Sequence, residues 1–342
     1  MKILFDHPSP FSLAHGGLQT QIEQTKEALE KEGVEVEWLR WWDVQQTGDA
    51  IHYFGRPQGS YIGHAKQKGM PVAIAELLTG LGSRPLHLRM VQRALMASAK
   101  KLLPRNFTSK MAWDSYQLAD AVLALTPWER TLMIEMFGAS PDRIHVVPNG
   151  VEEVFFNNPK SKIQNPKSPW LICTATITER KRVLELAEAA IAARTPVWII
   201  GKPYSESDAY HQRFLEVVKS SDEIVRYEGG ISDRARMAEI YQEARGFVLL
   251  STMESLSLSA LEAAAADCPL LLSDLPWARC TFEQKASYCP VAGATNTAPI
   301  LRKFYDASPT LPVPPRPATW MEVAEQLKGI YEGILANGNT SQ

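Results

Sequence analysis

Two carboxylates eight residues apart, Glu254 and Glu262, mark the part of this chain that is best suited to bind a polar ligand. A buried apolar strand is expected just before them, and the alanine-rich run 257–266 predicts a helix. The N–H groups of Ser257 and Leu258 at the start of that helix would be unpaired, and with the helix dipole they form a seat for a diphosphate. If both glutamates are helical, they lie about 12 Å apart, with Glu254 at the helix mouth.

A structural alternative accounts for the same residues. Ser259 and Glu262 have the spacing of a capping box, in which the two side chains satisfy N–H groups at the start of a helix. Glu254 is then an ordinary loop carboxylate. Spacing alone leaves both interpretations open.

A basic cluster, Arg180, Lys181 and Arg182, follows another expected strand near 170–176. Cations at the end of a strand can stabilise the negative charge of a bound anionic ligand. The alternative is a solvated basic start of the helix expected over 182–194. That arrangement is unfavourable because cations at a helix N-terminus oppose the helix dipole. An anionic ligand would relieve this conflict.

A third candidate is the glycine pair Gly16 and Gly17, between the strand expected over 1–6 and the helix expected over 17–32. Paired glycines let the backbone approach a ligand closely, although a plain turn explains them equally well.

The elements that must position these residues follow an α/β pattern. Short apolar runs alternate with amphipathic stretches along almost the whole chain, which predicts two doubly wound parallel sheets. Residues 1–150 are expected to form a first Rossmann-like domain, and residues 170–319 a second one. Between them, residues 151–169 are rich in Pro, Asn, Lys and Ser and indicate a linker. Residues 320–342 are expected to form a helix that packs back towards the first domain.

Ligands of such sheets bind at the carboxyl ends of the strands, so a cleft between the two domains is the expected site. The expected strands are 1–6, 34–39, 50–55, 71–77, 121–126, 144–149, 170–176, 196–201, 223–228, 246–251 and 269–274.

Composition narrows the class of protein. The 342 residues are 45% hydrophobic and 22% charged, which is typical of a globular protein, and the net charge of −2 argues against a globally basic nucleic-acid binder. The first apolar run ends at Asp6, too soon for a secretory signal, and no apolar stretch approaches the length of a membrane span. The four cysteines have neither CxxC nor metal-type spacing, so we expect free thiols in a reducing cytosol and no metal site.

Several motifs together resemble one known family. Glu254-x7-Glu262, followed by Ala-x-Ala and Pro269, looks like the Glu-x7-Glu motif of retaining family-four glycosyltransferases of GT-B fold. The resemblance is clear over about 119–282 and weak over 1–75. Further segments that match in order and spacing are 119–129, 143–151, Gly201, 227–233 and 240–241.

The resemblance implies transfer of a sugar from a nucleoside diphosphate sugar to an acceptor hydroxyl, with retention and with no metal or other cofactor. It implies that Glu254 and Lys181 take part in catalysis, with Glu254 holding hydroxyls of the donor sugar and Lys181 stabilising the diphosphate. Glu262 would bind the ribose hydroxyls. The second domain would bind the nucleotide sugar, and the first domain would form the acceptor side of the cleft. The other residues that it assigns to donor binding are Ser257, Leu258, Arg180, Arg182, Thr176, Gly16 and Gly17. The acceptor class stays open among a glycan, a lipid and a small molecule.

Two departures from the family pattern keep other functions open. Thr176 stands where family members usually have an arginine, and Glu76 stands where many have a sugar-binding histidine. We expect His7 and His52, the nearest histidines, to be structural. The alternatives are a GT-B epimerase or phosphorylase, or a nucleotide-sugar-binding scaffold without catalysis.

One further region stands out without reference to any family. Residues 77–113 contain no Asp or Glu, whereas 84–110 carry seven Lys and Arg residues. At helical spacing Arg89, Arg93 and Lys100 share one face, and several leucines and a valine are available for another. This pattern predicts either a basic amphipathic surface for an anionic membrane or acceptor, or a solvated helix face. The apolar positions are Leu88, Val91, Leu95 and Leu102.

Overall fold

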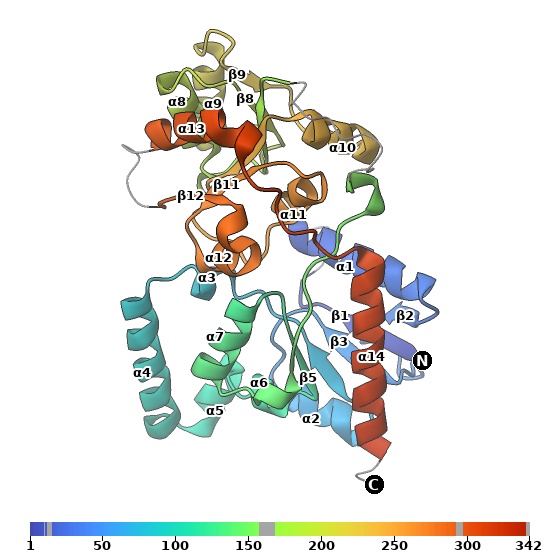
Figure 1. Cartoon of the computed structure of the whole chain (residues 1–342). Helices are drawn as coiled ribbons and strands as arrows, with labels where there is room; N and C mark the ends of the chain where they lie inside the picture. Colours follow the sequence, from blue (N-terminus) through green and yellow to red (C-terminus); the bar gives the residue numbers. More distant parts are fainter. Residues whose placement is uncertain (10, 12–15, 157–167, 292–296, 340–342) are drawn as a thin grey trace. The chain divides into compact units, whose positions relative to one another are not determined.

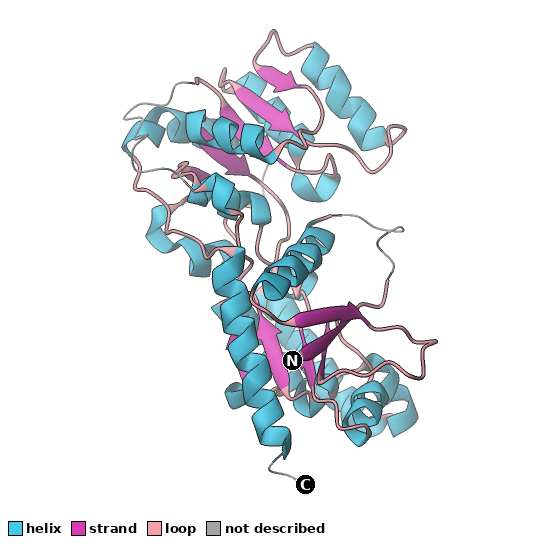
Figure 2. Ribbon diagram, turned by 90° about the vertical axis from the view of Figure 1, so that its right-hand side faces the viewer, coloured by secondary structure: helices cyan, strands magenta, loops and turns pink. Residues whose placement is uncertain are grey.

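The computed structural model divides the chain into two compact units, each with a six-stranded parallel sheet (Figure 1). The first unit contains residues 1–150 and 318–342, and the second contains residues 151–317. The structure describes residues 1–9, 11, 16–156, 168–291 and 297–339. Most of the expected linker, residues 157–167, therefore lies outside the described residues. Figure 2 shows helices flanking the strands of both sheets.

Four strands of the first unit, 2–6, 50–53, 72–74 and 121–124, are buried along most of their length, which explains their largely apolar sequences. The strand order in the sheet is β2-β1-β3-β4-β5-β6. The strands are β1 (Lys2–Asp6), β2 (Glu35–Trp38), β3 (Ala50–Tyr53), β4 (Val72–Ile74), β5 (Ala121–Ala124) and β6 (Ile144–Val146). The helices are α1 (Gly17–Lys31), α2 (Gly59–Gln67), α3 (Thr79–Gly82), α4 (Leu86–Leu102), α5 (Arg105–Thr108), α6 (Ser115–Leu118), α7 (Pro127–Phe137) and α14 (Trp320–Asn339).

The last helix, α14, belongs to the first unit and packs against α1 (Figure 1). It begins against Gly150, where a Cβ atom would come within 2.6 Å of the Trp320 backbone, so only glycine fits at this contact. Further along α14, the fully buried Tyr331 forms a 2.6 Å hydrogen bond through its hydroxyl with Nδ1 of His52 on β3. Helix α14 thus completes the buried core of the first unit together with β3.

The second unit has the strand order β12-β11-β10-β7-β8-β9. The chain runs from β7 outwards to β9 on one side, and then returns to β10 on the other side of β7. The crevice at the carboxyl ends of β7 and β10 is therefore the switch point at which ligands bind in such sheets. The strands are β7 (Leu171–Thr174), β8 (Val197–Ile200), β9 (Val225–Tyr227), β10 (Gly246–Leu249), β11 (Leu270–Ser273) and β12 (Ser287–Cys289). The helices are α8 (Val183–Ala192), α9 (Ala209–Lys219), α10 (Arg234–Glu243), α11 (Leu258–Ala265), α12 (Pro276–Phe282) and α13 (Thr297–Ala307).

The prediction of two parallel doubly wound sheets is confirmed, and each expected strand is present within a few residues of its expected bounds. One strand was not predicted. β12 has only three residues, two of them partly exposed, so its sequence lacks the apolar run that marks the other strands.

Three features of the described residues concern membrane spans, cysteines and metal binding. None of the described helices combines the length and the apolar character needed to cross a membrane. All four cysteines are free thiols, and three of them are buried. Within the described ranges, no group of His, Cys, Asp or Glu side chains is arranged to hold a metal ion.

Candidate functional site

The loops that follow β7 and β10 meet at the switch point of the second unit. The amide of Thr252, after β10, donates a 2.8 Å hydrogen bond to the carbonyl oxygen of Arg180, after β7. Close packing with the next strand fixes the chain just beyond β7, because a Cβ at Gly201 would lie 1.8 Å from the Ala175 carbonyl oxygen. The fold therefore brings together two segments that are about 70 residues apart in the sequence.

Two cations converge on Glu254 between these loops. Lys181 Nζ donates to Glu254 Oε1 at 2.5 Å, and Arg180 Nη1 donates to the same oxygen at 3.2 Å. Arg180 Nη1 also donates to the Met253 carbonyl oxygen at 3.0 Å. The side chains of Glu254 and Lys181 are 10% and 12% exposed, so little water screens their interaction. Two positive charges on one carboxylate leave a net charge of +1, which suits an anionic ligand.

The basic residues lie just before helix α8, which was expected to start at residue 182. Glu179–Lys181 form a 3-10 turn, and α8 starts at Val183. The helix therefore begins one residue after its expected start, and Arg180 and Lys181 precede it in a separate turn. The reason is the left-handed backbone of Arg182, with φ of 53°, which separates the turn from the helix.

Arg182 and Thr176 are placed differently from the other donor candidates. Arg182 is buried, and its Nη1 donates to the Val291 carbonyl oxygen at 3.1 Å, so its guanidinium already supports another loop. Thr176 is half-buried two residues beyond the end of β7. A threonine brings no positive charge to this position, so Arg180 and Lys181 are the cations that the structure places beside Glu254.

The start of α11 is capped by Ser257. Its Oγ accepts a 3.3 Å hydrogen bond from the Ala260 amide, and its carbonyl oxygen accepts one from Leu261 at 3.1 Å. The amides of Leu258 and Ser259 precede this bonding and are the first-turn donors of the helix. The capping-box interpretation, with Ser259 as the cap, is therefore wrong. Glu254 lies in the loop before α11, so the two glutamates do not share one helix.

Glu262 lies inside a network that reaches across the second unit. Its Oε1 accepts a 2.5 Å hydrogen bond from Arg234 Nη2, and its Oε2 accepts one from the Tyr241 hydroxyl at 3.2 Å. Arg234 Nε also donates to Glu152 at 2.6 Å, and the Tyr241 hydroxyl is 2.5 Å from Thr174 Oγ1. Burial raises the pKa of Glu262, and the nearby Arg234 partly offsets this.

Arg234 was not among the predicted site residues, although its place in the sequence indicates an anionic partner. Asp233 caps α10 by accepting a 3.1 Å hydrogen bond from the Arg236 amide, so Arg234 is the first residue of that helix. A cation there opposes the helix dipole and needs an anionic partner. Glu152 and Glu262 are those partners in the structure.

In the first unit, the glycine pair lies at the start of α1. Gly17 is the first residue of the helix, and the Gly16 carbonyl oxygen accepts a 3.2 Å hydrogen bond from the Thr20 amide. The loop just before the pair, residues 12–15, lies outside the described residues.

The position of the family histidine is filled by a well-paired carboxylate. Glu76 accepts two 2.7 Å hydrogen bonds from the guanidinium of Arg56 and a further one from the Tyr116 hydroxyl. His52 is buried against Tyr331, and burial lowers its pKa to about 3. A neutral, buried ring fits the structural role that we expected for His52.

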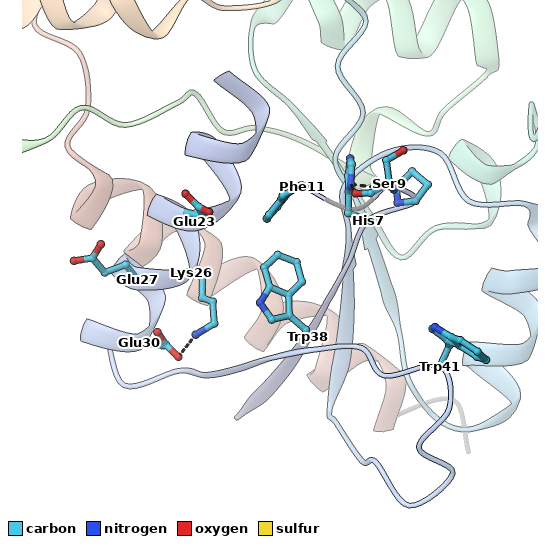
Figure 3. Close-up of a pocket in the computed structure, with 10 residues that line it drawn as sticks. His7, Ser9, Phe11, Glu23, Lys26, Glu27, Glu30, Trp38 and Trp41 are labelled. Carbon is cyan, nitrogen blue, oxygen red and sulfur yellow. Dashed lines mark hydrogen bonds and ion pairs between the residues drawn. The ribbon is translucent and has the colours of Figure 1, made fainter. Parts of the chain in front are cut away.

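A hollow of about 580 Å³ lies beside the edge strand β2, close to the carboxyl end of the sheet (Figure 3). Phe11 packs edge-on against Trp38, with ring centroids 5.5 Å apart. Helix α1 supplies several charged side chains, of which Lys26 and Glu30 form an ion pair. The hollow therefore offers flat apolar rings next to hydrogen-bonding groups. Its lining residues are His7, Pro8, Ser9, Phe11, Glu23, Lys26, Glu27, Glu30, Trp38 and Trp41.

The three cations expected on one face of α4 have different surroundings. Arg89 lies over the Trp128 ring, 4.4 Å from its centroid, and its Nε is buried without a hydrogen-bond acceptor among the described residues. Arg93 and Lys100 are exposed. Arg89 therefore packs inwards, so the prediction of a single three-cation surface patch is wrong at this residue.

Two family profiles match the chain. The profile described as "Glycosyl transferases group 1" matches residues 168–295, and that of "Glycosyltransferase Family 4" matches residues 87–154. Together they include the motifs on which the resemblance was based.

The chain is also similar in sequence to curated glycosyltransferases and in fold to solved structures. A D-inositol 3-phosphate glycosyltransferase of Kineococcus radiotolerans is 28% identical over 178 residues, which is 45% of this chain and 40% of the relative. Another, of Streptosporangium roseum, is 26% identical over 260 residues, or 65% and 57% of the two chains. Sucrose-phosphate synthase of Thermosynechococcus elongatus superposes with a TM-score of 0.66 at 16% identity, covering 99% of this chain and 98% of that one. Anabaena Alr3699/HepE in complex with UDP and glucose gives 0.63 at 14% identity, with both chains fully covered.

Proposed function

This chain belongs to the group 1 glycosyl transferases and has the GT-B fold, and from that premise we propose that it transfers a sugar from a nucleoside diphosphate sugar to an acceptor hydroxyl with retention. The observation that carries the proposal is the convergence of Lys181, Arg180 and Glu254 beside the first turn of α11. This arrangement lies at the switch point of the second sheet, where a nucleotide is expected to bind.

The diphosphate of the donor would lie between the cations and the helix. Lys181 and Arg180 exceed the charge of Glu254 by one, and the amides of Leu258 and Ser259 add the positive end of the α11 dipole. As the bond to the sugar breaks, negative charge grows on the diphosphate. Fixed cations and dipoles then stabilise the transition state more than the ground state. In this proposal the protein's own side chains supply the charge, and no cofactor takes part.

Glu254 would orient the sugar, and Glu262 the ribose. A carboxylate can accept about four hydrogen bonds, so Glu262 has capacity for ribose hydroxyls beside its bonds from Arg234 and Tyr241. Arg234 and Tyr241 act as positioning residues, because they hold the carboxylate without being assigned a contact with the substrate.

We assign the acceptor to the hollow beside β2. Ligand pockets combine apolar and aromatic walls with a few polar groups that fix orientation, and the hollow has both (Figure 3). A hydroxyl-rich ring of a glycan or a small molecule can lie against Trp38 or Trp41, while the glutamates of α1 accept its hydroxyl hydrogens. The free thiols fit a reducing compartment, so a cytosolic location is part of the proposal.

The test is turnover of a panel of nucleoside diphosphate sugars with purified full-length protein and a mixed acceptor library. We expect one donor to be consumed, with the anomeric configuration retained when the product is examined by NMR. Inversion would contradict retention alone. A changed sugar without transfer would indicate an epimerase, and phosphate-dependent cleavage a phosphorylase. Tight donor binding without any product would favour the scaffold alternative.

A further inference from the structure

Helix α4 exposes apolar side chains along most of its length. Met96 is the only fully buried residue among its 17. A stripe of three leucines and one valine, spaced to share one side of the helix, is open to solvent. At the side of the first unit, α4 makes few contacts with its neighbours (Figure 1). The exposed fractions are 47% for Leu88, 56% for Val91, 65% for Leu95 and 81% for Leu102.

The apolar surface extends beyond this stripe. Leu86 and Met90 widen it on α4, and Phe107 and Met111 continue it in the segment that follows. At helical spacing the outer half of α4 carries few polar side chains, whereas Arg89 and Met96 face inwards. Large contiguous apolar surfaces are rare on monomeric proteins and mark interaction sites.

The charged side chains of this segment are all of one sign. Residues 77–113 contain no Asp or Glu, so no carboxylate of the segment offsets its cations. Arg93 and Lys100, seven residues apart, are exposed on the side of α4 that also carries Arg89. There they border the apolar face next to Leu86, and Lys101 lies on the outer side of the helix. We call the exposed apolar residues of α4 together with Arg93, Lys100 and Lys101 the α4 surface.

We propose that the α4 surface docks on an anionic lipid bilayer. A helix with a broad apolar face and cationic flanks lies in the plane of a membrane interface, with the apolar side chains below the headgroups. Cations alone attract anionic headgroups, and an outward-facing helix suits a flat partner better than a groove does. A protein partner would be expected to carry carboxylates matched to particular cations. The proposal does not depend on the donor chemistry of the second unit.

Binding to vesicles tests this directly. Full-length protein is sedimented with phosphatidylcholine vesicles, with and without an equal part of phosphatidylglycerol, at low and at high salt. We expect binding only to the anionic vesicles, and weaker binding as salt shortens the range of the electrostatic field. The second measurement is circular dichroism of each variant, which shows that the fold is kept.

Two sets of variants separate the charges from the apolar residues. Replacing Arg93, Lys100 and Lys101 by Gln should weaken binding by about fivefold per residue, or on the order of a hundredfold together. A matched triple variant with the same loss of charge elsewhere should weaken it far less. Leu95→Ser with Leu102→Ser should also release the protein, because insertion of apolar side chains is lost. The matched triple is Lys68→Gln, Lys219→Gln and Lys303→Gln, all at exposed positions.

Clear outcomes would overturn the proposal. If wild-type protein does not sediment with anionic vesicles at low salt, the proposal is wrong. Equal loss in both triple variants would place the attraction in the overall charge and not on α4. If the wild type instead self-associates in sedimentation velocity and Leu95→Ser abolishes this, the α4 surface is an interface between copies of the chain.

Discussion

The two carboxylates of the Glu-x7-Glu motif have different surroundings, and we therefore expect them to have different roles. Glu254 is held by two cations in a loop, where positive charge is in excess, and in the proposed function this is where the diphosphate binds. Glu262 is held by one cation and a phenol in a buried place, where hydrogen bonding to neutral hydroxyls is favoured. Single substitutions should therefore separate phosphate binding from nucleoside binding.

Lys181→Ala should weaken binding of nucleoside diphosphate by about tenfold to a hundredfold, because a charge-assisted hydrogen bond contributes about 1.5–3 kcal/mol. Binding of the nucleoside alone should change little, and kcat/KM for the donor should fall. Calorimetry with both ligands measures the difference. Arg236→Gln, which removes a cation paired with Glu239 on the outside of α10, is the control. Equal losses for both ligands would contradict a phosphate role for Lys181.

Glu262→Ala should give the opposite pattern. Loss of charge-assisted bonds to ribose, about 1.5–3 kcal/mol each, should weaken nucleoside and nucleoside diphosphate alike and leave pyrophosphate binding unchanged. The same calorimetric series, extended to pyrophosphate, measures this. Unchanged nucleoside affinity in a folded variant would limit Glu262 to holding Arg234 and Tyr241 in place.

At the scale of elements, the contacts between helices and strands fix the first unit. His52 on β3 is enclosed by Phe54, with ring centroids 4.0 Å apart, and by Tyr331 of α14. A helix from the end of the chain thus covers a titratable group near its beginning. Docking of α14 is consequently linked to the protonation of this ring.

His52 should make the first unit less stable in acid. Burial depresses its pKa to about 3 from the usual 6.5, so between these values the unfolded chain binds a proton that the folded chain does not. Stability from this group is present above pH 6.5 and is lost as the pH falls. Between pH 7 and pH 5 the loss is about 2 kcal/mol. Urea unfolding of wild type and His52→Gln at both pH values measures it, and identical pH dependence of the two would refute it.

The hollow beside β2, at the edge of the first sheet, is the proposed acceptor site. Trp41→Ala should raise the KM for the acceptor severalfold and leave donor hydrolysis unchanged, because Trp41 lines the hollow beside β2 and is 85% exposed. Trp42→Ala is the matched control, since this neighbouring ring is also exposed and is not part of the lining. Steady-state kinetics with varied acceptor decide, and equal effects of the two substitutions would place the acceptor elsewhere.

At the scale of the whole molecule, the chain crosses from one unit to the other twice. Residues 151–317 form the second unit without a break, whereas the first unit needs both ends of the chain. The two units should therefore differ in how they tolerate truncation.

A fragment of residues 151–317 should fold alone and bind nucleoside diphosphate, because its sheet, Glu254, Glu262 and their partners are all within it. Residues 1–150 without α14 should expose the apolar face of α1 and aggregate or remain partly unfolded. Circular dichroism and calorimetry of both fragments test this. A stable 1–150 fragment would show that α14 is dispensable for the first unit.

Much of this protein was determined by local sequence. Short apolar runs indicated most of the strands and the α/β class, because burial on both faces of a parallel sheet requires them. Glu254 and Glu262, with the basic residues after β7, also stood out by type and spacing. The short strand β12 carried too little apolar sequence to be noticed.

Only the tertiary structure decided which partners these residues have. Arg234 binds Glu262 across 28 residues, Lys181 binds Glu254 across 73, and the capping of α11 by Ser257 depends on where the loop after β10 ends. For the same reason, Arg89 packs on the ring of Trp128, although its position in the sequence suggested a surface cation. Periodicity gives the face of a helix on which a side chain lies. What that face meets depends on contacts between segments far apart in the chain, which no local pattern specifies.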